Sequence, residues 1–445
     1  MTALNRKLFR DLFRMKGQAF AIALVMACGI AVFIMSLTTY RSLESARDAY
    51  YDRYRFAHVF AHLKRAPNAL RDRIAEIPGI SRVETRVVVD VTLDMPGMAE
   101  PVTGRLISLP ESGRGGLNRL HLRSGRYIEP GRNEVIASEP FVEAHGLKPG
   151  ARIRAIINGR LDTFRIVGVA ISPEYIYQIR PGDLLPDDKR FGVFWMDYEE
   201  LSTAYDLEGA FNNISLTLMR GASEPDVIRR LDRLTREYGG LGAYGREDQL
   251  SHRLISDEMK NLRSMSVITP SIFLAVAAFI INVVLSRLIN TQREQIATLK
   301  AFGYGRYEVG AHYLKFVLFI TVLALVIGAA AGGWLGKSMT GLYAMYFRFP
   351  AFSYRMDAGV VFLSFLISGA AAVLGILGAV IRAMKLPPAE AMRPEPPGIY
   401  KPTLLERIGM QRLFSPPARM FLRQLERRRS ALSFPASASP CPAPC

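Results

Sequence analysis

Four stretches of the chain are apolar enough and long enough to cross a membrane. They cover residues 19–37, 267–285, 316–335 and 360–381, and none of them contains Asp, Glu, Lys or Arg. About 18 consecutive apolar residues are sufficient for a transmembrane helix. The pattern therefore predicts an α-helical membrane protein with four transmembrane helices.

The polar segment between the second and third apolar runs carries a helical pattern of its own. Apolar residues recur at three- and four-residue steps from Leu285 to Phe302, and charged residues lie on the other faces. We expect the second apolar run to continue as an amphipathic helix until Gly303 and Gly305 end it. A helix that leaves the membrane in this way is available for binding by another protein.

Lysine and arginine cluster beside the apolar runs, in residues 6–16, 287–315 and 382–393. By the positive-inside rule these three segments are cytoplasmic, and both chain termini are cytoplasmic with them. Much of the net charge of +17 therefore reflects the orientation of the chain in the membrane. We expect contact with membrane lipid and no nucleic-acid binding.

These patterns divide the chain into ten segments. The first apolar run is longer than the core of a signal peptide and lacks a good cleavage site, so we expect it to be retained. We predict a cytoplasmic amphipathic helix (1–17), four transmembrane helices (18–39, 266–286, 316–336 and 360–381), an extracytoplasmic domain (40–265), a cytoplasmic coupling loop (287–315), a short external loop (337–359), a cytoplasmic tail (382–429) and a low-complexity end (430–445).

The extracytoplasmic segment has an α+β pattern and no cysteine. Strand, helix and strand are expected at 56–63, 68–77 and 83–93, and again at 213–219, 224–237 and 241–244. Two such units predict a split ferredoxin-like fold. Residues 102–197 favour short strands, with a hairpin at Asn158-Gly159, and indicate an inserted β-rich subdomain.

Residues 247–263 are helical in pattern and lead directly into the second apolar run. A continuous helix over residues 247–285 would be about 58 Å long. Pro270 is expected to kink it near the outer interface. Such a stalk could carry movement between the extracytoplasmic domain and the coupling loop.

Small residues repeat in the third apolar run, where Gly328, Gly332 and Gly336 are spaced four apart. This spacing lets helix backbones approach closely in lipid, so we assign these glycines to helix packing rather than to a substrate pathway. A pore for a hydrophilic solute would be expected to show a polar row, and the four runs carry none.

Motifs for catalysis and for nucleotide or metal binding are incomplete. Gly336-Lys337-Ser338 resembles the end of a phosphate-binding loop, but the required earlier glycine is Ala331. His58 and His62 have metal-ligand spacing only if they lie on a helix, and their surroundings alternate like a strand. We therefore expect no enzyme activity, no metal site and no cofactor in this chain.

A sequence pattern from the beginning of the chain recurs near its end. Residues 422–427 repeat the basic amphipathic pattern of residues 9–14, whereas residues 431–445 are rich in Ala, Pro and Ser and lack an apolar run. We interpret this as the start of a second copy of the four-span unit. The hypothesis is that the parent protein continues and that the chain is truncated or frameshifted near Arg429.

Three segments together resemble the FtsX-like permease family, of the type called MacB-like or lipoprotein-release-like. They are QREQIATLKAFGYGRYEV at 292–309, the segment GRYIEPGRNEVIASEP and its continuation at 125–169, and KLPPAEAMRPE at 385–395. The resemblance extends over about residues 4–397. It implies a permease subunit of an ABC transporter in the bacterial inner membrane, with ATP hydrolysis in a separate ABC ATPase.

The resemblance also implies a coupling helix in the loop after the second span, which docks on the ATPase. The matching positions are Arg293, Glu294, Leu299, Lys300 and Gly303, with Ala297 as a departure where many members have a nearby glycine. The family works by mechanotransmission, which here implies export or extraction of a lipophilic or envelope substrate. A second permease half or a homodimer is implied as partner, and a periplasmic adaptor is a further candidate. The alternative is FtsX-like signalling that activates a cell-wall hydrolase without transport.

Overall fold

The computed structural model describes residues 3–110, 116–183 and 185–385. The chain divides into two compact units, and residues 293–303 belong to the smaller one, whereas the larger one contains residues 1–292 and 304–385. Three predicted features lie outside the described residues. They are the cytoplasmic tail beyond residue 385, the repeated pattern at 422–427 and the low-complexity end.

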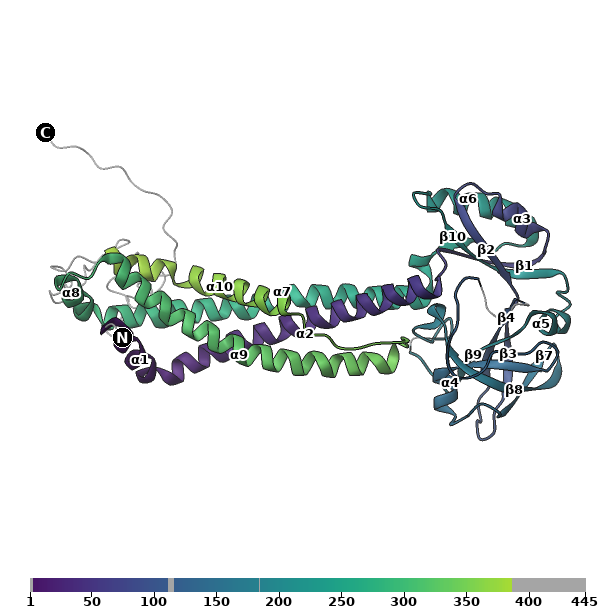
Figure 1. Ribbon diagram of the computed structural model, residues 1–445, viewed down its shortest axis with the longest axis horizontal. Coiled ribbons are helices and arrows are strands. Elements are labelled where there is room, and N and C mark those ends of the chain that lie inside the picture. The colour runs from purple at the N-terminus through teal and green to yellow at the C-terminus, as the bar shows by residue number, and fades with distance from the viewer. Residues whose placement is uncertain (1–2, 111–115, 184, 386–445) are drawn as a thin grey trace, which may run out of the picture. The chain divides into compact units, whose positions relative to one another are not determined.

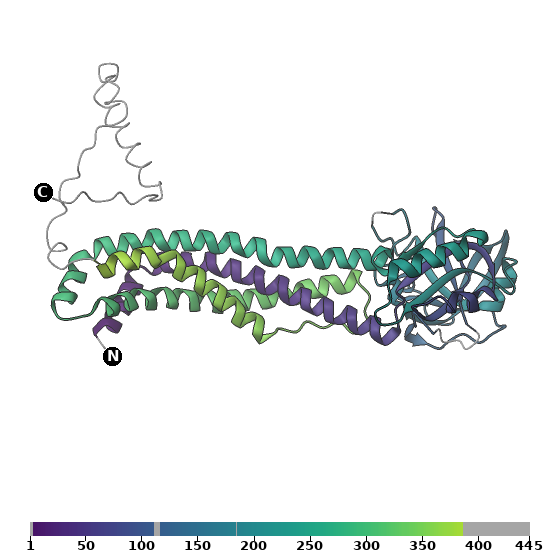
Figure 2. The ribbon, with the colours of Figure 1, turned by 90° about the horizontal axis from the view of Figure 1, so that it is seen from above.

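Four long helices contain the four predicted apolar runs. They are α2 (Lys16–Tyr54), α7 (Leu250–Thr291), α9 (Arg306–Tyr346) and α10 (Ala358–Lys385), and all are long and apolar enough to cross a membrane. A short amphipathic helix, α1 (Ala3–Arg14), precedes α2. The prediction of four transmembrane helices is confirmed, and Figures 1 and 2 show them side by side as a bundle.

Three of these helices continue well beyond their apolar runs. The apolar run of α2 ends at residue 37, yet the helix continues to Tyr54, and α9 likewise continues to Tyr346. Helix α7 begins 17 residues before its apolar run. α2 packs against both α7 and α9, so the single stalk expected from the sequence is in fact one of three adjoining helices (Figure 2).

The expected helix boundaries around α7 are wrong at both ends. The helix starts at Leu250 because residues 246–248 form a 3₁₀ turn, after which the Gln249 side chain accepts a hydrogen bond from His252 N. It runs through Pro270 and ends at Thr291, giving 42 residues and a length of about 63 Å. The amphipathic continuation toward Gly303 is therefore interrupted at Gln292, and a separate helix, α8 (Arg293–Ala301), follows.

A four-stranded antiparallel sheet forms the first part of the sheet domain, our name for residues 55–249. Its strands lie in the order β11 (Ala243–Gly245), β1 (Val59–Pro67), β10 (Ala210–Leu218) and β2 (Ile80–Arg86). Helices α3 (Leu70–Ala75) and α6 (Glu224–Thr235) each connect two strands and pack on a core that includes Ile74, Leu216 and Leu231. This order is that of the predicted split ferredoxin-like fold, which is confirmed.

The inserted subdomain is a small barrel. Its sheet has the order β5 (His121–Gly125), β8 (Arg160–Ile171), β6 (Glu134–Ser138), β9 (Phe191–Asp197), β4 (Val102–Leu109), β3 (Val88–Asp94) and β7 (Arg152–Ile157). A further pairing of β7 with β8 closes six of these strands. Helices α4 (Glu139–Ala144) and α5 (Tyr198–Ala204) pack beside β9. The predicted hairpin is confirmed, since Asn158 and Gly159 have φ of 46° and 80° between β7 and β8.

The expected single strand at 83–93 is wrong. It is two strands, of which β2 pairs with β10 in the first sheet and β3 pairs with β4 and β7 in the barrel. The change of sheet occurs at Val87, which is fully buried and whose N–H donates to Ser108 Oγ at 2.9 Å. Residues 83–89 contain no Gly, Pro, Asn or Asp, so the sequence gives no turn signal at the change of sheet.

Candidate functional site

The coupling helix predicted between the second and third spans corresponds to α8. Arg293 opens the helix, Glu294 lies exposed in its first turn and Lys300 lies in its last turn. Leu299 is half-buried. Gly303 follows with φ of 93°, a conformation that favours glycine and ends the helical course. The five predicted residues thus belong to one short helix and its end.

A buried polar cluster surrounds the end of α7. The Gln292 side chain accepts a hydrogen bond from Lys7 Nζ at 2.7 Å and lies 3.4 Å from the hydroxyl of Tyr313. Lys7 also pairs with Asp11 at 2.6 Å, and His312 Nε2 lies 3.9 Å from the same carboxylate. The interruption between α7 and α8 is therefore tied to both α1 and the start of α9.

The Asp11 carboxylate is ionised in this cluster. Burial alone would raise its pKa, but the neighbouring His312 ring and the Lys7 ammonium outweigh burial and lower the pKa of Asp11 well below its usual range. A carboxyl with a lowered pKa stabilises the fold above the pKa it has when unfolded. That stabilisation disappears only as the pH falls through the lowered value.

Replacing Asp11 by Asn should loosen α1 at neutral pH, because Lys7 would then lose its charged partner. We expect a cost of about 2 kcal/mol in local opening, measured as faster amide hydrogen exchange of α1 in nanodiscs. The substitution Asp257→Asn removes an exposed carboxylate that pairs with Lys260 at 3.1 Å, and it should have little effect. Equal changes in both variants would contradict a structural role for the cluster.

At the other end of the bundle, α2, α7 and α9 share a core with the sheet domain. Its buried side chains include Tyr50 and Phe56, Ile255 and Met259, and Tyr343. The Tyr343 hydroxyl donates to the Glu258 carboxylate and thereby joins α9 to α7. A displacement of any one of these helices would therefore disturb the packing of the other two.

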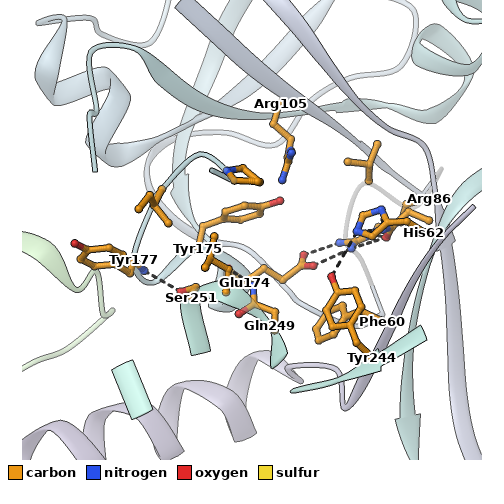
Figure 3. A pocket seen from close by; sticks show the side chains of 15 residues that line it. Phe60, His62, Arg86, Arg105, Glu174, Tyr175, Tyr177, Tyr244, Gln249 and Ser251 are labelled. Atoms are coloured by element: carbon orange, nitrogen blue, oxygen red, sulfur yellow. Dashed lines mark hydrogen bonds and ion pairs between the residues drawn. The ribbon is translucent and has the colours of Figure 1, made fainter. Parts of the chain in front are cut away.

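A cavity of about 200 Å³ lies at the junction of the two sheets and the start of α7. Figure 3 shows the side chains that line it. Arg86 on β2 donates to both carboxylate oxygens of Glu174, at 2.6 and 2.8 Å, and Asn213 on β10 accepts from the same guanidinium. Glu174 belongs to the 3₁₀ turn η1 (Pro173–Tyr175) that follows β8. This buried ion pair links the ferredoxin-like sheet to the barrel.

The same turn is bonded to α7. Gln249 Nε2 donates to the carbonyl oxygen of Glu174 at 2.8 Å, and the N–H of Tyr177 donates to Ser251 Oγ at 2.9 Å. Figure 3 places these residues along one wall of the cavity. Both sheets and the long helix therefore meet at Glu174.

A second attachment joins the α9–α10 connection to the barrel. Arg348 pairs with Glu143 at 2.9 Å, and its N–H donates to the carbonyl oxygen of Ile176 at 2.8 Å. Arg123 donates to the carbonyl oxygens of Phe349 and Pro350, at 2.7 and 3.1 Å. Movement of α9 or α10 would thus reach the barrel independently of α7.

The three glycines assigned to helix packing lie on the side of α9 that faces α2. A Cβ atom added at Gly328 would lie 2.7 Å from Ile30 Cβ, and one at Gly332 would lie 2.8 Å from the Ala31 carbonyl oxygen. At Gly336 it would lie 2.8 Å from the Tyr354 ring. These distances are shorter than the contacts that Cβ atoms make in proteins.

The two histidines with metal-ligand spacing make local hydrogen bonds. His62 lies on β1, where Asn213 Nδ2 donates to its Nδ1 at 3.0 Å. His58 Nδ1 accepts from the N–H of Leu218 at 3.2 Å. Among the residues that the structure describes, three or more His, Cys, Asp or Glu side chains do not gather into a candidate metal site.

Sequence reasoning missed the features that join these elements. Gln292 resembles any polar residue of the loop, and Arg86 and Glu174 are 88 positions apart. The one available signal was a polar position inside an amphipathic pattern, at Gln292. The contacts of Gln292, Arg86 and Glu174 arise because the fold brings separate helices and strands together.

The fold is that of a membrane protein with four apolar helices and a β-rich domain, and family comparisons agree with it. Residues 19–234 match the family described as MacB-like periplasmic core domain, and residues 267–388 match the family described as FtsX-like permease C-terminal. The chain therefore carries a MacB-like periplasmic core domain and an FtsX-like permease C-terminal domain. A search among curated proteins found no match.

Two solved structures are similar to parts of the chain. The periplasmic region of MacB from Actinobacillus actinomycetemcomitans is 13% identical, with 46% of this chain and 93% of that chain covered and a TM-score of 0.28. The extracellular domain of the noncanonic ABC-type transporter YknZ from Gram-positive bacteria is 13% identical, with 42% and 98% covered and a TM-score of 0.28.

Proposed function

We propose that this permease works with a separate ABC ATPase by mechanotransmission, and that it exports or extracts a lipophilic or envelope substrate. The observation that supports this most directly is the course of α7. It runs unbroken from the Gln292 cluster to the junction at Glu174. A helix of about 63 Å that is fixed at both ends by buried polar contacts can transmit a displacement along its axis.

The ATPase is proposed to act on α8. Glu294 and Lys300 offer one charge of each sign on a short helix, and Phe302 just beyond it is 80% exposed. Aromatic residues are enriched in protein interfaces, whose rims are polar. The orientation expected from the positive-inside rule places α8 in the cytoplasm, where ATP is available.

The substrate proposal depends on the character of the four spans. Their described faces expose large apolar side chains, including Ile272 and Phe279 on α7 and Leu374 on α10. We infer that substrate is handled at the lipid surface or in the sheet domain rather than through a polar pore. A complete transporter would require a second permease half or a second copy of this chain, and a periplasmic adaptor is a further proposed partner.

Exchanging the charges of α8, with Glu294→Lys and Lys300→Glu together, should reduce co-purification with the ATPase about tenfold or more, since both interface charges then meet like charges. Affinity capture from cells that express the full-length chain with the ATPase measures this. Asp226→Arg with Arg229→Asp exchanges an exposed pair on α6 and serves as control. An undiminished complex would place the docking surface elsewhere.

A further inference from the structure

A groove on the side of the helix bundle lies where α1, α2 and α9 meet. It encloses about 440 Å³. This volume is within the usual range of small-molecule sites, about 300–1,000 Å³. The groove is lined by Leu12 from α1, by Lys16, Gly17, Ala19 and Phe20 from α2, and by Leu323 from α9. It therefore combines one cationic side chain, that of Lys16, with an apolar wall.

The cation and the apolar wall lie at different depths along the bundle. Lys16 precedes the first apolar run and belongs to the basic segment expected in the cytoplasm. Phe20 lies inside that run, and Leu323 lies seven residues beyond the start of the third run at residue 316, which is about 10 Å along the helix. α2 and α9 run in the same direction, because the packing glycines of α9 face successive turns of α2. The groove thus leads from the headgroup level into the hydrocarbon of the cytoplasmic leaflet.

The backbone forms this groove without a ligand. The chain changes direction at Met15, between α1 and α2 (Figure 1), and the N–H of Met15 donates to the Asp11 carbonyl oxygen at 3.1 Å. The Asp11 carboxylate pairs with Lys7, which also donates to Gln292, so α1 is anchored to the bundle. A Cβ atom added at Gly17 would meet no other atom within 4 Å. The surface of α2 at Gly17 is therefore open to a ligand.

The charge of Lys16 is not balanced by a neighbouring carboxylate. The first turn of α2 contains no acidic residue. The acidic residue nearest in sequence, Asp11, pairs with Lys7 at 2.6 Å. Across the described residues Lys16 forms no salt bridge, and its side chain is exposed. Its ammonium group can thus attract an external phosphate, as lysines beside a membrane surface do.

We propose that this groove binds one anionic phospholipid of the cytoplasmic leaflet, with the phosphate on Lys16 and an acyl chain against Leu12, Phe20 and Leu323. The order of cation and apolar wall along the groove is the order of headgroup and chain in such a lipid. A free phosphate would leave the apolar wall uncovered. The proposal goes beyond the coupling function, since binding requires neither an ATPase nor transport.

A tryptophan placed in the groove would report the bound lipid. We would use Phe20→Trp in the full-length chain together with Trp334→Phe, so that the reporter and Trp195 are its tryptophans. Trp195 is buried in the sheet domain and gives a constant background. The chain would be reconstituted in phosphatidylcholine vesicles that contain increasing fractions of brominated phosphatidylglycerol or of brominated phosphatidylcholine with the same acyl chains. Because bromine quenches tryptophan on contact, we expect about fivefold preferential binding of phosphatidylglycerol.

The substitution Phe279→Trp in the same background reports lipid that merely surrounds the protein. Phe279 is 65% exposed on α7 and lies within the second apolar run, 267–285. Quenching at this position should follow the bulk lipid composition to within about twofold, since only the general attraction of a basic protein for anionic lipid acts there.

Three substitutions test the two parts of the groove. Lys16→Gln should abolish the preference for phosphatidylglycerol at the Phe20→Trp reporter. Lys315→Gln should leave it unchanged, because Lys315 is likewise exposed and directly precedes an apolar run but does not line the groove. Gly17→Leu should fill the groove and weaken quenching by both brominated lipids. It should not lower the thermal unfolding midpoint, because the added Cβ meets open space.

Three results would overturn the proposal. Equal preference for phosphatidylglycerol at the Phe20→Trp and Phe279→Trp reporters would indicate general attraction only. A preference that persists after Lys16→Gln would show that Lys16 does not bind the headgroup. Absence of quenching by either lipid at the Phe20→Trp reporter would show that protein covers the groove, and a smaller particle mass for Gly17→Leu would then identify a second copy of the chain as the occupant.

Discussion

Removing either partner of the Arg86–Glu174 ion pair is expected to destabilise the sheet domain by about 3–5 kcal/mol, because the remaining charge would be buried without its counter-ion. The side chains of Arg86 and Glu174 are 7% and 8% exposed. Burial disfavours the charged guanidinium, yet the adjacent carboxylate raises the pKa of Arg86. The pair is therefore ionised, and each charge depends on the other.

The substitution Glu174→Gln in the full-length chain tests this. Amide hydrogen exchange in β2, β10 and the η1 turn should accelerate by about two to four orders of magnitude. Arg154→Met breaks a half-exposed pair with Asp94 on the barrel surface, with side chains 51% and 44% exposed. It should cost less than about 1 kcal/mol. Similar effects of both substitutions would show that burial does not raise the cost of breaking the Arg86–Glu174 ion pair.

Replacing both Arg86 and Glu174 by Met would distinguish the contribution of this ion pair to stability from its contribution to the transmission of movement. A buried ion pair exchanged for apolar side chains of similar volume is often neutral for stability, so much of the loss in the single variants should be recovered. The connection between β2 and the η1 turn would nevertheless be changed. If the junction at Glu174 relays movement, the double variant should remain folded while substrate-dependent stimulation of the ATPase falls.

The parts of the fold that could be predicted are those set by local chemistry. An uncharged apolar run of the length of residues 316–335 is stable in a bilayer only as a helix, so α9 follows from composition. Asn158-Gly159 suits a turn with two positive φ values, so the β7–β8 hairpin follows from two residues. In each case the neighbours in sequence determine the structure.

The parts that could not be predicted depend on contacts between distant residues. No Gly, Pro, Asn or Asp lies beside Val87, and only the pairing of β2 with β10 and of β3 with β4 separates the two strands. Gln292 is 285 positions from its partner Lys7. Arg123 donates to the carbonyl oxygen of Phe349, which is 226 positions away. Periodicity carries no information about such pairs.

Replacing Gly332 by Leu should separate α2 from α9, because the added Cβ alone would lie 2.8 Å from the Ala31 carbonyl oxygen and 3.0 Å from Ile34 Cβ. Backbone cannot yield as a flexible side chain can, so we expect a loss at or above the upper end of the usual overpacking cost of about 1–3 kcal/mol. The measurement is the thermal unfolding midpoint of the purified full-length chain in one detergent, with Gly332→Ala giving a smaller decrease in the same direction.

Matched glycines decide whether this effect reflects the contact with α2. Gly341 lies on the same helix with nothing within 4 Å of an added Cβ, and at Gly333 the nearest atom is the flexible Met356 sulfur at 3.3 Å. If close approach of α2 and α9 determines stability, Gly341→Leu should be nearly neutral and Gly333→Ala should cost little, whereas Gly328→Leu should resemble Gly332→Leu. A uniform decrease at all four positions would instead indicate a general loss of glycine flexibility. The tight α2–α9 contact would then not be what holds the two helices together.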